Sequence, residues 1–300
     1  MTETLSAYEG VGGLKVLRDG AFAITGKLST PLDGVLAPLR SERYLAEANA
    51  CANLAAVITT PALAERLDGR LGVAVAEEPD AAHAEVHAKL VAAREAALRA
   101  RHTRIDPSAR IDGSASVADY GVEVGPNVYV GPRSVLLPGS TIEADCALHV
   151  GAVIGVAGFQ SARIGGRQRI APQLGGVRLK TGVELLADVS VARALFGGET
   201  VLGEETLADC HVYIAHDCQI GRRVQICALA NILGRVVIGD DAYVGPSAVV
   251  VNGARIGAGA KLTMGAVVTR DVEAGTTVSG NFAIEHHRFL DHLRAIRGEI

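Results

Sequence analysis

The sequence contains no tryptophan, and aromatic residues make up only 4% of its 300 residues. Hydrophobic residues nevertheless account for 49%, so aliphatic and small side chains have to fill the core. A narrow stack of Val, Ile, Leu and Ala has no room for rings, which favours a solenoid. The formal net charge of −4 is small, and this argues against a protein that binds nucleic acid through a general positive charge.

Signals for export and for membrane insertion are also missing. The five cysteines include no Cys-x-x-Cys pair, and their odd number favours reduced core or corner residues over a disulfide framework. The N-terminus lacks a basic segment followed by an apolar run, and no apolar run reaches 18 residues. We therefore expect a cytoplasmic protein with no integral membrane segment.

A six-residue period dominates the second half of the chain. Aliphatic residues recur without a break at Ile214, Ile220, Ile226, Ile232, Ile238, Val244, Val250, Ile256, Leu262 and Val268. No helix has a six-residue period, and a single strand alternates by two. The repeat therefore predicts a parallel β-helix, in which three hexads close a triangular coil and residues 18 apart stack about 4.8 Å apart.

The limits of this repeat divide the chain into three parts. Residues 1–100 lack it and predict a small α/β domain, with a helix over 81–100 that leads into the solenoid. Residues 101–281 are predicted to form the β-helix, with an inserted arm at 157–182 where the phase is lost. Apolar residues at helical spacing predict a terminal helix over 282–300.

The inserted arm is basic. No Asp or Glu occurs between Cys146 and Val183, whereas the same stretch contains Arg163, Arg167, Arg169, Arg178 and Lys180. Such a loop suits the phosphate groups of a nucleotide or of a phosphopantetheine carrier. We assign Arg163, Arg169 and Lys180 as candidate phosphate-binding residues. The alternative is a solvated hairpin that happens to be basic.

His216 is the candidate catalytic residue. It stands two residues after a core aliphatic, and steps of 18 from it reach Gly234 and Asn252. One edge of the solenoid is therefore predicted to stack a histidine beside the backbone amide of a glycine. A general base next to an oxyanion donor is what acyl transfer from a thioester to an amine requires. A structural corner histidine is the alternative, and we expect Asp217 to point away from His216 because neighbouring side chains on a strand face opposite sides.

We predict no metal site. His211 and His216 lie five residues apart, and zinc-binding β-helix carbonic anhydrases use a histidine pair at this spacing, but no third histidine occurs between 149 and 211 or from 217 to 285. His286, His287 and His292 are expected at the surface of the terminal helix or in oligomer packing. Arg288, Arg294 and Arg297 on the same helix are candidates for contact with an acidic carrier protein.

Three segments carry a family resemblance: IGVAGF (154–159), APQLGGVRLKTGVEL (171–185) and YIAHDCQIG (213–221). In this order and spacing they resemble the UDP-3-O-acylglucosamine N-acyltransferases of lipid A biosynthesis, known as LpxD, over roughly 20–285. The resemblance implies a left-handed parallel β-helix homotrimer that takes an acyl-carrier-protein thioester as donor. It also implies that His216 is the general base and that the Gly234 amide forms the oxyanion hole.

The same resemblance supplies candidate substrate-binding residues. Ser41 and Tyr44 align with positions of the family's uracil clamp, although only the tyrosine matches, and Gln173 and Asn252 lie in retained segments. A second family histidine falls at Ala254, and the family's upstream Asp-Arg-Gly-Ala segment is replaced by Val-Ala-Arg-Ala-Leu at 191–195. A paralogue that acylates a different amine is therefore an alternative.

The sequence thus predicts a cytoplasmic, homotrimeric N-acyltransferase. It would move an acyl group from the phosphopantetheine of acyl carrier protein, or from acyl-CoA, to the amine of an amino sugar or nucleotide sugar, with no permanently bound cofactor. An acetyl-CoA-dependent sugar O- or N-acetyltransferase, a non-catalytic hexapeptide-repeat assembly subunit and a zinc hydratase are the alternatives.

Overall fold

The computed structural model describes residues 2–164 and 166–298 and separates into two compact units. The first unit contains the described residues up to Ala96, together with Phe159–Leu174 and Phe196–Gly198. The second contains Ala97–Gly158, Gly175–Leu195 and the described residues from Glu199 onwards. The small N-terminal domain predicted at 1–100 therefore recruits two short segments that are distant in sequence.

The first unit is an α/β domain built on a five-stranded sheet, as expected. The strand order is β2 (Lys15–Arg18), β7 (Gly72–Val75), β6 (Leu54–Thr59), β5 (Val35–Leu39) and β4 (Ile24–Thr25), and only β2 runs antiparallel to its neighbour. The remaining elements are β1 (Glu3–Thr4), β3 (Ala21–Phe22), α1 (Leu45–Ala50), α2 (Pro61–Ala64) and α3 (Pro79–Arg99), with the 3₁₀ turns η1 (Leu5–Tyr8), η2 (Val11–Gly13) and η3 (Glu42–Tyr44). Alternate residues of β5 enter two separate apolar clusters, so both faces of the sheet are covered.

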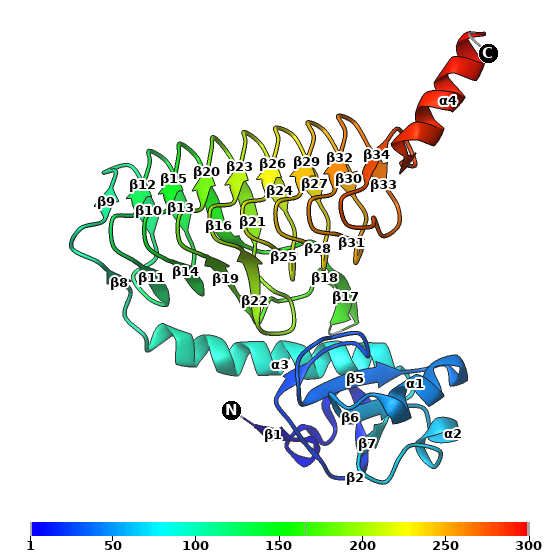
Figure 1. Ribbon diagram of the computed structural model, residues 1–300. Helices are drawn as coiled ribbons and strands as arrows, with labels where there is room; N and C mark the ends of the chain where they lie inside the picture. Colours follow the sequence, from blue (N-terminus) through cyan, green and yellow to red (C-terminus); the bar gives the residue numbers. More distant parts are fainter. Residues whose placement is uncertain (1, 165, 299–300) are drawn as a thin grey trace. The chain divides into compact units, whose positions relative to one another are not determined.

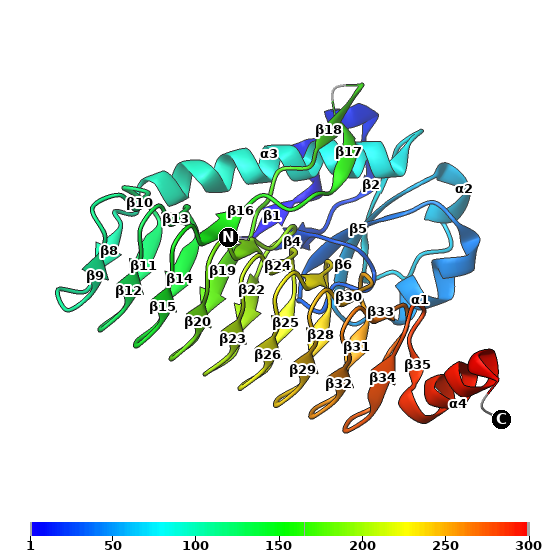
Figure 2. The same ribbon diagram turned by 90° about the horizontal axis from the view of Figure 1, so that it is seen from above.

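The second unit is a left-handed parallel β-helix whose coils stack along one axis (Figures 1 and 2). Sheet A consists of β10 (Ser116–Val117), β13 (Val135–Leu136), β16 (Val153–Val156), β21 (Ser190–Ala192), β24 (Tyr213–Ile214), β27 (Asn231–Ile232), β30 (Val249–Val250) and β33 (Val267–Val268). Sheet B consists of β8 (Arg104–Ile105), β11 (Val122–Val124), β14 (Ser140–Ile142), β19 (Gly176–Leu179), β22 (Glu199–Leu202), β25 (Gln219–Ile220), β28 (Val237–Ile238) and β31 (Arg255–Ile256).

Sheet C completes the prism. It consists of β9 (Arg110–Ile111), β12 (Tyr129–Val130), β15 (Ala147–Leu148), β20 (Glu184–Leu185), β23 (Leu207–Ala208), β26 (Gln225–Ile226), β29 (Tyr243–Val244), β32 (Lys261–Leu262), β34 (Thr277–Ser279) and the antiparallel β35 (Ile284–Glu285). The predicted 18-residue stacking is present, since Ile214 pairs with Ile232 and Ile232 with Val250. Among the described residues of this unit, the buried cluster holds Val, Leu, Ile, Ala and Cys and no aromatic residue, in keeping with the composition.

Two predicted boundaries need correction. The chain leaves the solenoid after β16 and forms the antiparallel hairpin of β17 (Ser161–Ile164) and β18 (Arg167–Ile170), but it returns at β19, so the arm is shorter than 157–182. The terminal helix α4 (His286–Arg297) begins only after β35 has paired with β34. No helix among the described residues combines the length and the apolar character needed to cross a membrane.

Candidate functional site

His216 lies at a corner where the chain passes from sheet A to sheet B. The two preceding corners of this kind are irregular: the first contains the 161–170 hairpin, and the second contains a loop over 193–198. The residues at the roots of these two excursions are Gly158 and Leu195, and both contact the His216 corner. The candidate site is therefore built where the regular ladder is interrupted.

His216 and Asp217 form a hydrogen-bonded pair. His216 is 7% exposed, and its Nδ1 lies 2.7 Å from Oδ2 of Asp217. The carboxylate also accepts the backbone N–H of Leu195, with both oxygens 3.2 Å from that nitrogen. Because a carboxylate only accepts, the Nδ1 atom donates this hydrogen bond, and in the neutral ring Nε2 is then the atom with the lone pair. The expectation that Asp217 would point away is wrong.

The error has a local cause. Alternation of side chains holds for extended strands, whereas Asp217 adopts the left-handed conformation with φ of 61°. This corner conformation turns the side chain back toward the preceding residue. The backbone N–H of Asp217 donates to Oγ1 of Thr200 at 2.9 Å, which fixes the corner.

Gly234 lies against the imidazole, as the 18-residue spacing predicted. A Cβ at this position would be 2.8 Å from both Cε1 and Nε2 of His216, so only glycine allows this approach. Among residues 2–164 and 166–298, no hydrogen-bond acceptor is found for the Gly234 N–H. A backbone donor beside the imidazole of His216 is thus available to a bound group. Asn252 is exposed one coil further on, next to Gly253, whose N–H donates to Gly234.

Gly158 packs against the other end of the same ring. A Cβ there would lie 2.9 Å from Cδ2 and 3.1 Å from Cβ of His216. This residue lies in the IGVAGF segment, just before Phe159, and was not singled out from the sequence. The imidazole is therefore held between two glycines and one carboxylate, which leaves it little freedom to rotate.

The basic residues of the arm do not form one cluster. Arg163 pairs with Gln168 and Arg169 with Ala162 across the hairpin, so the two arginines lie on opposite faces of it. Lys180 lies on the solenoid just after β19. The neighbouring Arg178 is already occupied, since it donates to the carboxylates of Glu143 and Glu199, and the hydrogen bond to Glu199 raises its pKa.

The remaining candidates belong to the first unit. Gln173 is 6% exposed, and its amide donates to the carbonyl of Ala171 at 2.9 Å. Ser41 precedes η3, and Tyr44 closes it with 43% of its surface exposed and the Arg43 guanidinium 5.5 Å from the ring centroid. Tyr44 thus presents an accessible ring, whereas Gln173 is largely covered.

Among the residues that the structure describes, no cluster suits a metal ion, and the two buried cysteines are not activated. No group of three or more His, Cys, Asp or Glu side chains that could hold a metal ion occurs among these residues. Burial raises the pKa of Cys218 to about 12 and that of Cys146 to about 11. Neither thiol therefore serves as a nucleophile near neutral pH.

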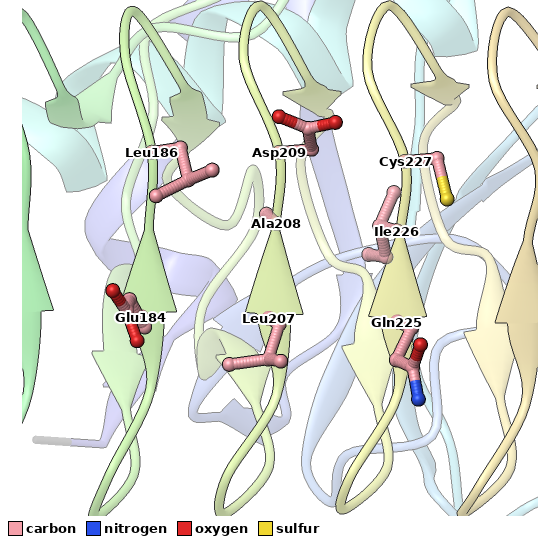
Figure 3. Close-up of a pocket in the computed structure, with 8 residues that line it drawn as sticks. All are labelled: Glu184, Leu186, Leu207, Ala208, Asp209, Gln225, Ile226 and Cys227. Carbon is pink, nitrogen blue, oxygen red and sulfur yellow. The ribbon is translucent and has the colours of Figure 1, made fainter.

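A shallow hollow of about 300 Å³ lies on sheet C over β20, β23 and β26 (Figure 3). Its two carboxylates have structural partners: Glu184 contacts Nε2 of His149, and Asp209 accepts the backbone N–H groups of Cys210 and Ala228. The described residues that line the hollow include no histidine. The hollow therefore has no imidazole comparable with that of His216 at the corner between sheets A and B.

Comparison with known proteins supports both the fold and the resemblance. The family model for bacterial transferase hexapeptide (six repeats) matches residues 235–270. The UDP-3-O-acylglucosamine N-acyltransferase of Caulobacter sp. (strain K31) is 36% identical over 136 residues, which cover 45% of this chain and 39% of that protein. The UDP-3-O-acylglucosamine N-acyltransferase of Helicobacter pylori (strain ATCC 700392 / 26695) is 35% identical over 164 residues, which cover 53% of this chain and 48% of that protein.

The matched stretches thus span less than half the length of these two relatives. Among solved structures, a UDP-N-acetylglucosamine acyltransferase from Campylobacter jejuni has a TM-score of 0.51 at 20% identity, over 61% of this chain and 74% of that one. At this identity the structural likeness bears on the fold alone. The chain thus contains hexapeptide repeats and is similar in sequence to the UDP-3-O-acylglucosamine N-acyltransferases, and its fold resembles that of the Campylobacter jejuni structure.

Proposed function

We propose that this protein is an N-acyltransferase that moves an acyl group from a thioester to the amine of an amino sugar or nucleotide sugar. The observation that carries the proposal is the pair of His216 and Asp217 beside the N–H of Gly234, for which the described residues supply no acceptor. The similarity to UDP-3-O-acylglucosamine N-acyltransferases supports the choice of reaction.

The chemistry follows from the two groups. As the amine nitrogen attacks the thioester carbonyl carbon, Nε2 of His216 takes up the amine proton and Asp217 stabilises the resulting imidazolium. The carbonyl oxygen becomes an oxyanion that accepts the Gly234 N–H. Collapse of the tetrahedral intermediate breaks the carbon–sulfur bond, and the imidazolium returns its proton to the thiolate that leaves.

The donor is an acyl carrier protein or acyl-CoA, which is consumed as a co-substrate, so no resident cofactor is needed. Helix α4 supports a carrier-protein donor because none of its residues is buried and it bears Arg288, Arg294 and Arg297, to which an acidic partner is attracted. On the acceptor side, Ser41 and the exposed Tyr44 are the residues proposed to contact a nucleotide base, with Gln173 and Asn252 as further substrate contacts. Arg163, Arg169 and Lys180 are proposed for phosphate.

The cytoplasmic location and the homotrimer stay predictions. Light scattering measures the mass of the particle directly: a trimer of 31.0 kDa chains is expected, and a monomer would overturn that prediction.

The decisive test replaces His216 with alanine. Acyl transfer is followed by mass spectrometry with acyl-carrier-protein and acyl-CoA donors of several chain lengths and a panel of UDP-linked and other amino sugars. Loss of a general base lowers kcat/KM by about 10²- to 10⁴-fold. His211→Ala is the matched control, since His211 occupies a different corner and is more than half exposed. A His216→Ala enzyme within about threefold of wild type would refute the assignment, and transfer of acetyl groups alone would favour an acetyltransferase.

A further inference from the structure

The coil that ends at His216 is longer than the coils that follow it. Along sheet A, Ile214 pairs with Ile232 and Ile232 with Val250, each 18 positions on, but Val191 pairs with Ile214, 23 positions on. The five additional residues lie in the loop over 193–198, between β21 and β22. This loop brings the Leu195 N–H to both carboxylate oxygens of Asp217.

The additional residues also change how the corner itself is held. In the next two coils, the residue with positive φ at the corner between sheets A and B donates its N–H to a carbonyl of the coil before it. Arg235 donates to His216 and Gly253 to Gly234, both at 2.9 Å. Asp217 occupies the equivalent position. The coil before it is displaced by the loop, and the N–H of Asp217 instead donates to the hydroxyl of Thr200. At this corner a hydrogen bond to a side chain thus replaces the backbone hydrogen bond between successive coils.

Thr200 is unusual for its place in the fold. It is 0% exposed on the inner side of β22, where its Cα partner in the preceding coil is Val177. A hydroxyl in this aliphatic column is expected to need a hydrogen-bonding partner, because an unpaired buried polar group is costly. Its Oγ1 contacts the backbone of the residue whose carboxylate holds His216.

We propose that Thr200 is a positioning residue for the His216–Asp217 pair, acting together with the backbone N–H of Leu195. Thr200 fixes the backbone of Asp217 in its left-handed conformation, and the Leu195 N–H fixes the carboxylate. Together they keep Nδ1 of His216 protonated and direct Nε2 outward as the base. The inference rests on the proposed acyl transfer at His216. It adds Thr200, which lies outside the three segments that carry the family resemblance.

The test compares three variants. Thr200→Val keeps the shape of the side chain and removes the hydroxyl, whereas Thr200→Ser keeps the hydroxyl. Thr206→Val is the matched control, because Thr206 is also 0% exposed in the same solenoid but its hydroxyl contacts the Gly221 carbonyl and the Val224 N–H instead of Asp217. All three are first compared with wild type by thermal unfolding.

Two readouts follow. In steady-state kinetics, Thr200→Val is expected to lower kcat by about 10- to 100-fold with little change in KM, because a misplaced base impairs the chemical step. Thr200→Ser should restore most of kcat, and Thr206→Val should leave it unchanged. In ¹⁵N NMR of the histidine side chains, assigned with His216→Gln, wild type is expected to show the Nδ1–H tautomer of His216, and Thr200→Val a mixture of the two tautomers.

The NMR readout needs no substrate, so it separates this inference from the proposed function. If wild type transfers no acyl group to any acceptor, the proposed function fails while the tautomer shift still decides the role of Thr200. If Thr200→Val leaves the tautomer and kcat as they are in Thr206→Val, Thr200 is structural only and the inference is overturned.

Discussion

Substitution of Gly234 by alanine tests the candidate site through geometry alone. The new Cβ would lie 2.8 Å from Cε1 and Nε2 of His216, whereas ordinary van der Waals contact begins near 3.4 Å. The ring and the corner must therefore separate by about 0.6 Å, the difference between these two distances. Gly158 packs against the other end of the ring and Asp217 holds Nδ1, so the imidazole has little room to retreat.

A displacement of about 1 Å can cost about 100-fold in rate, so Gly234→Ala is expected to lower kcat by about 10- to 100-fold. The overpacking should reduce the free energy of unfolding by about 1–3 kcal/mol, which urea unfolding measures. Gly113→Ala is the control, because a Cβ at Gly113 meets no atom within 4 Å in the same solenoid. If Gly234→Ala retained wild-type kcat while unfolding at the same urea concentration as Gly113→Ala, the close approach of Gly234 to His216 would be wrong.

Three further predictions concern other parts of the molecule. Asp217→Asn should lower kcat by about 10²- to 10⁴-fold, because an amide NH₂ facing Nδ1 of His216 favours the wrong tautomer. The assay is kcat measured across the pH range. A decrease in kcat of tenfold or less at every pH would contradict this prediction. Burial lowers the pKa of His83 to about 3. Below about pH 6.5 this histidine is therefore protonated in the unfolded chain but stays neutral in the folded chain, so the free energy of unfolding decreases as the pH falls. Between pH 7.5 and 5.0, wild type should lose about 2 kcal/mol more in urea unfolding than His83→Gln, and parallel losses would exclude the effect. A uridine nucleotide should raise the Tm of wild type and of Tyr44→Phe but not that of Tyr44→Ala; an equal rise in all three would remove Tyr44 from the site.

The solenoid could be predicted from the sequence because its packing is periodic. Each inward position of a coil faces the same aliphatic column, so the six-residue spacing and the scarcity of rings have a single physical cause. The stacking of His216 on Gly234 followed from that period alone and is confirmed. The long helix α3 agrees with the predicted helix over 81–100, and it buries two histidines, His83 and His87, beside Val86 and Leu90.

Predictions were wrong where the period breaks. The predicted arm over 157–182 places the return of the repeat at Val183, yet Val177 lies six positions earlier and is already buried in the core. That spacing was visible in the sequence and would have placed Arg178 on the solenoid. The contact of Asp217 with His216 had no comparable signal, because it depends on a positive φ that only the corner geometry reveals.

The location of the site follows from how a β-helix satisfies its own polar groups. In regular coils each strand donates to the next and accepts from the one before, so few backbone groups remain available to a substrate. Three consecutive passages from sheet A to sheet B break this rule: the hairpin after Gly158, the loop containing Leu195 and the corner of His216. Each break places one group against the imidazole or its carboxylate, and the regular coil that follows adds Gly234. The uniform coils hold these groups rigidly in place, and the irregular ones supply the chemistry.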